Sequence, residues 1–116
     1  MRREHRLRRR ADFAAVYRTG KVEGNRLLVV RARPGEGGVT RFGFAVGKVV
    51  GGAVVRNRIK RRLRAACDTL RIVEGLDIVI GARRTAAEAD YAALRHSLAT
   101  LLGRAGALRG PSQESR

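Results

Sequence analysis

The segment 51–67 constrains the fold more than any other part of the chain. At 100° per residue, its apolar side chains fall on one helical stripe and its charged side chains on the opposite arc. The stripe comprises Val55, Ile59, Leu63, Ala66 and Leu70. The opposite arc comprises Asn57, Arg58, Lys60, Arg61 and Arg64, with Arg56 and Arg62 at its borders. The pattern predicts a helix over residues 53–71 that packs one side on a core and exposes a row of cations on the other.

This row of cations indicates a polyanionic partner. Like charges four residues apart, such as Lys60 and Arg64, destabilise an isolated helix by a few tenths of a kcal/mol per pair. A merely solvated basic face would normally include acidic residues, yet residues 37–67 contain no Asp or Glu. The whole chain has a formal net charge of +16, which favours phosphate in nucleic acid or on a membrane surface. We therefore favour nucleic-acid binding over a solvated helix face.

The chain length of 116 residues predicts a single domain. We expect a flexible basic arm over 1–10 that orders on phosphate, an RNA-binding domain over 11–105 and a disordered tail over 106–116. No run approaches the roughly 18 apolar residues of a spanning helix, and no signal peptide is recognisable. The single Cys67 cannot form an internal disulfide, which favours a reducing, cytoplasmic location.

The remaining elements alternate between helices and strands. We expect a helix over 11–19, an edge strand over 21–23, strands over 26–33 and 41–48, the basic helix, and an inner strand over 76–82. A last helix opens either at a capping box from Thr85 to Glu88 or at Asp90. In strand 26–33, Leu28, Val30 and Ala32 should face the core, with Leu27 on the other face. The order α, β, β, β, α, β, α predicts an α+β sandwich of helices against one four-stranded sheet.

Two features predict a surface for unpaired bases, each with a structural alternative. Phe13 and Tyr17 lie one turn apart in the first helix, where they either pack in the core or stack on bases. Gly43, Ala45 and Gly47 share one face of strand 41–48, opposite the core residues Phe42, Phe44 and Val46. Such a face forms a shallow groove, or else marks a bulge or the close approach of another backbone.

The sequence offers no convincing catalytic or metal site. Its 10 acidic residues are scattered, whereas a metal-dependent nuclease needs clustered carboxylates. The glycine spacings match no nucleotide-binding motif, so we expect no small-molecule cofactor. The chain should therefore contribute binding, and not catalytic groups, to any reaction on RNA.

Taken in order, these residues resemble the protein subunit of bacterial ribonuclease P. The basic helix carries the family's signature over 56–61, followed by Leu63 and Arg64, and residues 43–48 match the preceding strand. Residues 5–8 and 12–17 match the family's opening, and residues 77–83 match its last strand. The resemblance covers about residues 5–105.

The resemblance implies that a large RNA hydrolyses precursor tRNA with Mg²⁺ to release the 5′ leader, assisted by the small protein. By matched position it implies two sets of binding residues. The leader cleft would comprise Phe13, Tyr17, Val29, Arg31, Gly43, Ala45 and Gly47. The surface for the catalytic RNA would comprise Lys48, Arg56, Asn57, Arg58, Lys60, Arg61 and Arg64. No catalytic residue, metal ligand or membrane contact is implied for the protein.

The chain departs from the family pattern at three positions. Arg31 stands where an aromatic is common, Val49 where a second Lys is common, and Gly52 where Asn is common. The family also implies a left-handed β-α-β crossover around the basic helix, whereas general rules give a right-handed one in about 98% of cases. A ribosomal or other structural RNA-binding protein is the alternative; a DNA-binding regulator fits poorly, because no short helix precedes the basic one.

Overall fold

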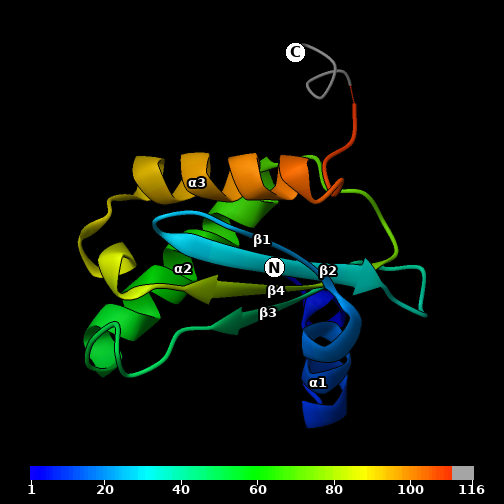
Figure 1. Ribbon diagram of the computed structural model, residues 1–116, viewed down its shortest axis with the longest axis horizontal. Coiled ribbons are helices and arrows are strands. Elements are labelled where there is room, and N and C mark those ends of the chain that lie inside the picture. The colour runs from blue at the N-terminus through cyan, green and yellow to red at the C-terminus, as the bar shows by residue number, and fades with distance from the viewer. Residues whose placement is uncertain (111–116) are drawn as a thin grey trace.

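The computed structural model describes residues 1–110 as one sheet between two layers of helices (Figure 1). The helices are α1 (Arg10–Thr19), α2 (Ala53–Thr69) and α3 (Tyr91–Arg104), with short 3₁₀ helices η1 (Arg3–His5) and η2 (Arg84–Glu88). The strands are β1 (Lys21–Gly24), β2 (Leu28–Pro34), β3 (Arg41–Ala45) and β4 (Leu76–Ala82). This is the expected α+β architecture with one four-stranded sheet.

The sheet has the strand order β1-β2-β4-β3. Strand β4, the last to be synthesised, is therefore central, and pairs antiparallel with β2 and parallel with β3. Helix α2 connects β3 to β4, as a parallel pair requires. The hand of this crossover stays a prediction from the resemblance.

The main core lies between the sheet and the α2–α3 layer. The predicted stripe of α2 points into it: Ile59, Leu63 and Ala66 are fully buried against residues such as Ile78 and Leu98. A smaller core of Leu7, Val16 and Val79 lies under α1 on the opposite face of the sheet. Both faces of the central strand are thus covered, which explains the continuous apolar run in its sequence.

Several element boundaries differ from those predicted. β3 ends at Ala45 because residues 47–51 form turns, in which the Val50 N–H donates to the Gly47 carbonyl at 3.1 Å. The capping box at Thr85 was a wrong interpretation: residues 84–88 form η2, and α3 starts after Asp90, whose Oδ1 accepts from the Ala93 N–H at 2.8 Å. Leu27 is buried and does not face away from the core, because it precedes β2 in the turn that Asn25 stabilises.

Packing against the domain extends further toward both ends of the chain than the predicted bounds of 11–105. In the arm, Leu7 is buried and its N–H donates to the Phe42 carbonyl at 2.8 Å. At the other end, Ala107 is buried and its carbonyl accepts from the Val73 N–H at 2.8 Å. The tail boundary predicted at residue 106 is therefore corrected for residues 106–110, and residues 111–116 lie outside the described part.

Candidate nucleic-acid interface

The face of the sheet under α1 is built from cross-strand rows of mostly small residues. Residues directly opposite one another in neighbouring strands point to the same face. One row runs across all four strands and comprises Gly24, Val29, Gly81 and Ala45. The adjacent row comprises Val22, Arg31, Val79 and Gly43. Helix α1 packs over the second of these rows, where Val79 is fully buried, and leaves Val29, Gly81 and Ala45 of the first row half-buried.

Gly43 allows α1 to lie close to the sheet. A Cβ at this position would collide with the Phe13 ring, so the ring rests directly on the backbone of β3. Phe13 also packs on the small core of Leu7, Val16 and Val79. The Phe13 ring is therefore what approaches Gly43 closely. Phe13 is at least partly a packing residue, as one of its two sequence alternatives held.

Tyr17, one turn further along α1, is in a different environment. Its side chain is 47% exposed, and the Arg31 guanidinium carbon lies 4.7 Å from its ring centroid. This is a cation–π pair at the margin of the half-buried row. Arg31, which departs from the resemblance, thus contributes a planar cation stacked on an aromatic ring.

The small-residue sheet face beside α1 differs in one position from the groove floor predicted from the sequence. Gly47 lies beyond the end of β3, is exposed, and has no atom within 4 Å of an added Cβ. Gly81 instead lies between Val29 and Ala45, and an added Cβ there would lie 3.7 and 3.8 Å from their carbonyl oxygens. The sequence signal for Gly81 was a glycine inside an otherwise apolar inner strand, two residues after Val79.

The predicted polar residues of α2 and its approach divide into exposed and engaged groups. Arg61 and the neutral Asn57 of α2 are exposed, as is Lys48 before the helix, whereas Lys60 and Arg64 are half-buried. The Arg56 Nε donates to the Gly51 carbonyl at 3.1 Å, at the start of the helix. Arg58 and Arg62 reach the carbonyls of Ala87 and Ala89 at 3.5 and 2.9 Å, which ties α2 to η2 and the residue after it. Arg58 therefore has a structural contact that its place on the predicted cationic arc does not reveal.

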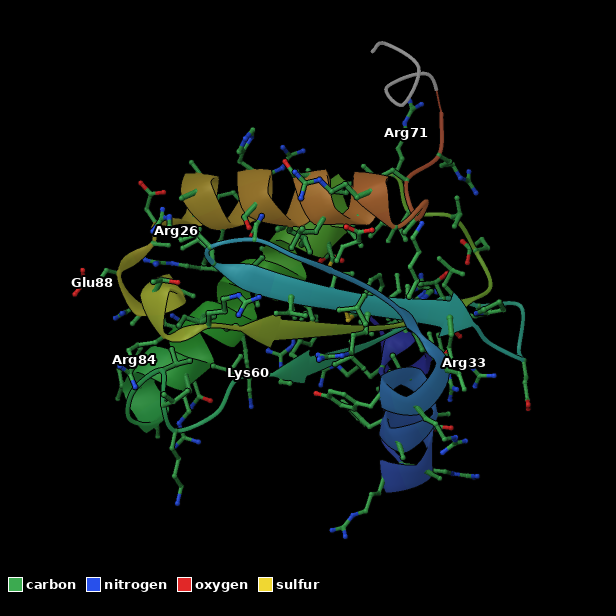
Figure 2. The ribbon with its side chains drawn as sticks, in the orientation of Figure 1. Arg26, Arg33, Lys60, Arg71, Arg84 and Glu88 are labelled. Carbon is green, nitrogen blue, oxygen red and sulfur yellow. The ribbon has the colours of Figure 1, made fainter. Side chains whose placement is uncertain are left out.

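Basic side chains also extend beyond α2. Figure 2 shows Arg26, Arg33, Arg71 and Arg84 projecting outward from other parts of the molecule, on several sides of it. The excess positive charge of the chain is therefore not confined to α2.

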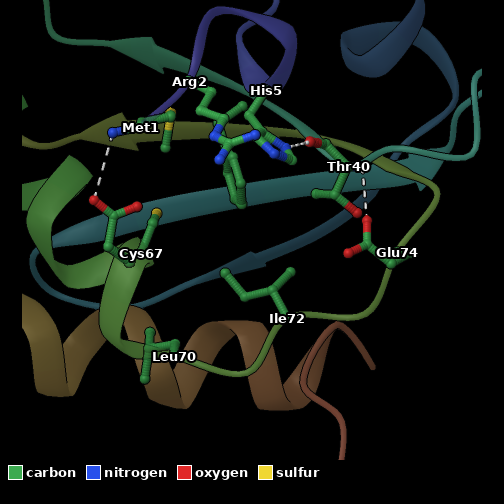
Figure 3. Close-up of a pocket in the computed structure, with 10 residues that line it drawn as sticks. Met1, Arg2, His5, Thr40, Cys67, Leu70, Ile72 and Glu74 are labelled. Atoms are coloured by element: carbon green, nitrogen blue, oxygen red, sulfur yellow. Dashed lines mark hydrogen bonds and ion pairs between the residues drawn. The ribbon is translucent and has the colours of Figure 1, made fainter.

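A separate cavity of about 430 Å³ lies between the arm, the start of β3 and the end of α2 (Figure 3). Two contacts connect the arm to the domain at this cavity: the Met1 amino group lies 3.5 Å from Asp68, and the His5 Nδ1 lies 2.9 Å from the Thr40 carbonyl. These contacts anchor the arm. Within residues 1–110, no three His, Cys, Asp or Glu side chains lie close enough to hold a metal ion, and none of the helices is long and apolar enough to span a bilayer.

Fold and site together define a small, strongly basic α+β domain with a half-open sheet face on one side and a cationic helix on the other. The family model described as Ribonuclease P matches residues 1–106. The chain belongs to the family of ribonuclease P protein components.

Individual relatives agree with this assignment. The ribonuclease P protein component of Streptomyces bikiniensis is 47% identical over 112 residues, covering 87% of this chain and 91% of that protein. That of Symbiobacterium thermophilum is 42% identical, covering 94% and 97%. The solved RNase P protein of Staphylococcus aureus is 31% identical with a TM-score of 0.83, covering 90% of this chain and 98% of that one.

Proposed function

We propose that this chain is the protein subunit of a ribonuclease P whose RNA subunit performs the hydrolysis. The protein binds that RNA through the exposed side of α2 and binds the single-stranded 5′ leader of precursor tRNA in the cleft beside α1. Mg²⁺, used by the RNA subunit, supplies the metal chemistry. The protein's own groups bind and orient RNA strands.

One observation carries the leader assignment: Tyr17, stacked with Arg31, borders a row of small residues on a half-open sheet face. Every base has a π-face, so an exposed ring beside a low floor binds unpaired nucleotides with little sequence preference. A duplex cannot use such a ring in this way, because its bases are already stacked on one another inside the helix. Phe13, which packs on Gly43, positions α1 and contributes less of its ring surface to a ligand.

The α2 assignment is supported by charge and packing. Lys48, Asn57 and Arg61 are exposed, and Lys60 and Arg64 are half-buried next to them, without an acidic neighbour from residue 37 to 67. Each phosphate neutralised by such a cation releases counterions, so binding should weaken steeply with salt. Arg56 and Arg58 of the predicted set also donate hydrogen bonds to backbone carbonyls of the protein itself, so part of their hydrogen-bonding capacity is already used.

Reconstitution with the ribonuclease P RNA of the same organism tests this proposal. We expect RNA-free protein to leave precursor tRNA intact, and the protein to increase cleavage by the RNA most at low Mg²⁺. Specific removal of the 5′ leader by RNA-free protein would overturn the division of roles. Equal binding of leader-bearing and mature tRNA by the holoenzyme would instead favour a general structural RNA-binding protein.

A further inference from the structure

A cavity of about 300 Å³ lies at the outer edge of β3, where the arm, α1, β3 and α2 meet. Four cations line it: Arg6 and Arg8 from the arm, and Lys60 and Arg64 from α2. No carboxylate is among its lining residues. The volume is at the lower end of the range of about 300 to 1,000 Å³ for small-ligand pockets, so the site accommodates a single charged group of a larger ligand.

The wall of this cavity includes an open strand edge. β3 is the edge strand of the sheet, and the arm pairs with it only through the isolated bridge between Arg6 and Phe42. The Phe42 carbonyl points to this edge, because it accepts from the Leu7 N–H. Backbone groups two residues apart in a strand point the same way, so the N–H of Phe44 also faces the cavity side. An edge N–H beside four cations favours an anion.

Arg64 provides the second observation. Its Nε is buried and has no hydrogen-bond partner among the described residues. Its guanidinium carbon lies 5.5 Å from the Phe44 ring centroid, so the ring holds the group against the cavity wall. A buried, unpaired guanidinium N–H calls for an acceptor, and phosphate oxygens match the fork of an arginine.

We infer that this cavity binds a phosphate group of an RNA strand that passes around the edge of β3. The inference rests on the proposed function, because the cavity lies between the cleft on one face of the sheet and the cationic helix on the other. It assigns the arm residues Arg6 and Arg8 to RNA binding together with Lys60 and Arg64. The strand is either the catalytic RNA or the leader, and the two share the phosphodiester that the site recognises.

The test uses two matched double variants in the full-length protein. Arg6→Gln with Arg8→Gln removes the arm's two cavity cations, while the backbone bond of Leu7 to Phe42 remains. Arg9→Gln with Arg10→Gln removes the same charge from adjacent exposed positions that do not line the cavity. Equal melting temperatures would establish that both variants keep the fold.

Salt dependence then identifies the strand. If the catalytic RNA supplies the phosphate, the cavity variant should reduce the slope of log affinity against log salt for that RNA by about 0.7 to 0.9 per lost contact, relative to the matched control. If the leader supplies it, the same reduction should occur for holoenzyme binding to leader-bearing tRNA. Equal slopes of the two double variants in both assays would overturn the inference.

Inorganic phosphate provides a direct probe of the site. Amide NMR of the wild-type protein should show phosphate-dependent shifts at Leu7 and Phe44 that the cavity variant loses and the control keeps. Phosphate binding with unchanged RNA slopes would show a free-anion site only, and would refute the RNA assignment. A wild-type protein that binds no ribonuclease P RNA would refute the proposed function itself, which is a distinct result.

Discussion

Arg41 on the edge strand β3 donates two hydrogen bonds to Asp77 on the central strand β4. The Nε–Oδ1 and Nη2–Oδ2 distances are 3.0 and 2.9 Å, and the two residues are register partners. The same guanidinium reaches Asp12 of α1 at 3.3 Å. The hydrogen bond with Asp77 is the main reason that the pKa of Arg41 is raised above its usual value. Asp12 belongs to α1, so this cluster ties α1 to the sheet on which it packs.

Replacing Asp77 with Asn should destabilise the protein by roughly 1–3 kcal/mol, because Arg41 would lose a charged acceptor that is only 5% exposed. Chemical denaturation measures the change. Asp68→Asn is the matched control: its carboxylate is 56% exposed, and an exposed pair contributes about 0–1 kcal/mol. A loss no greater for Asp77→Asn than for Asp68→Asn would contradict a stabilising role for the cluster.

Tyr17→Ala should weaken holoenzyme binding to leader-bearing tRNA by about 1–3 kcal/mol, which is the usual contribution of one stacked base. Binding of mature tRNA should hardly change, because it lacks the leader. The ratio of the two affinities is the observable, and Tyr17→Phe, which keeps the ring, is the control. Since Tyr17 is 47% exposed and belongs to neither core cluster, its loss should change the melting temperature little. An unchanged affinity ratio would remove Tyr17 from the cleft.

Phe13→Ala should behave differently from Tyr17→Ala. It removes a ring that packs on Gly43 and the small core, so we expect the free energy of unfolding to fall. A fully buried Phe truncated to Ala costs about 3–5 kcal/mol, and this half-buried ring should cost less. Its effect on leader binding should follow from displacement of α1. Thermal unfolding and the affinity ratio, measured together, separate the two roles.

Two glycines of the proposed cleft should respond differently to the same added methyl group. Gly43→Ala forces the Phe13 ring to move and should cost about 1–3 kcal/mol, as overpacking does. Gly81→Ala introduces only ordinary contacts of 3.7 and 3.8 Å and should leave stability unchanged or slightly higher. Gly81→Val should then fill the floor and lower leader affinity without unfolding the protein. Wild-type leader affinity in a folded Gly81→Val variant would place the leader elsewhere.

Arg61 and Arg58 should separate RNA binding from stability in α2. Arg61→Gln removes an exposed cation, so the salt slope for RNA binding should fall by about 0.7 to 0.9 while the melting temperature holds. Arg58→Gln also removes the contact with the Ala87 carbonyl and should lower both quantities. Arg104→Gln, an exposed cation at the end of α3, is the charge-matched control.

The thiol of Cys67 should be unreactive in the folded protein. Burial raises its pKa from 9.0 to about 12, so alkylation at pH 8 should be far slower than in urea. The unfolded thiol ionises above pH 9 and the folded thiol does not, so this residue's contribution to stability is present below pH 9 and declines as the pH rises toward 12. The stability difference between the wild type and Cys67→Ala should therefore shrink over that range. A pH-independent difference would show that the thiol ionises equally in both states.

The sequence predicted elements whose periodicity extends over several turns or a whole strand. The stripe of α2 and the run that forms β4 occur where expected, because burial alone determines both patterns. Local signals were less reliable. Residues 85–88 have the spacing of a helix capping box, yet the Thr85 hydroxyl donates to the carbonyl of Arg26, which is distant in the sequence. Such a contact depends on chain segments 59 residues apart, which no local pattern contains.

The sequence predicted that Phe13, Tyr17 and the small residues of β3 lie near one another, and the structure places Phe13 directly on Gly43. The position of Gly81 beside Val29 and Ala45 depends on the strand order, which places β4 between β2 and β3. The arm presented the opposite difficulty: seven residues of 2–10 are Arg or His, so composition favoured a solvated segment. The contact of Leu7 with the edge of β3 outweighs that bias, because one buried leucine and one backbone hydrogen bond are enough to hold a short segment.

The central position of β4 governs how this chain can fold during its own synthesis. A nascent chain that ends before residue 76 contains β2 and β3 but not the strand that joins them. Until residues 76–82 leave the ribosomal exit tunnel, the apolar faces of β2, β3 and α2 have no completed sheet to pack against, and long-range pairing of this kind is slow. The sheet is therefore completed only after β4 has emerged, so the pairing of β4 with both β2 and β3 is a late step of folding during synthesis.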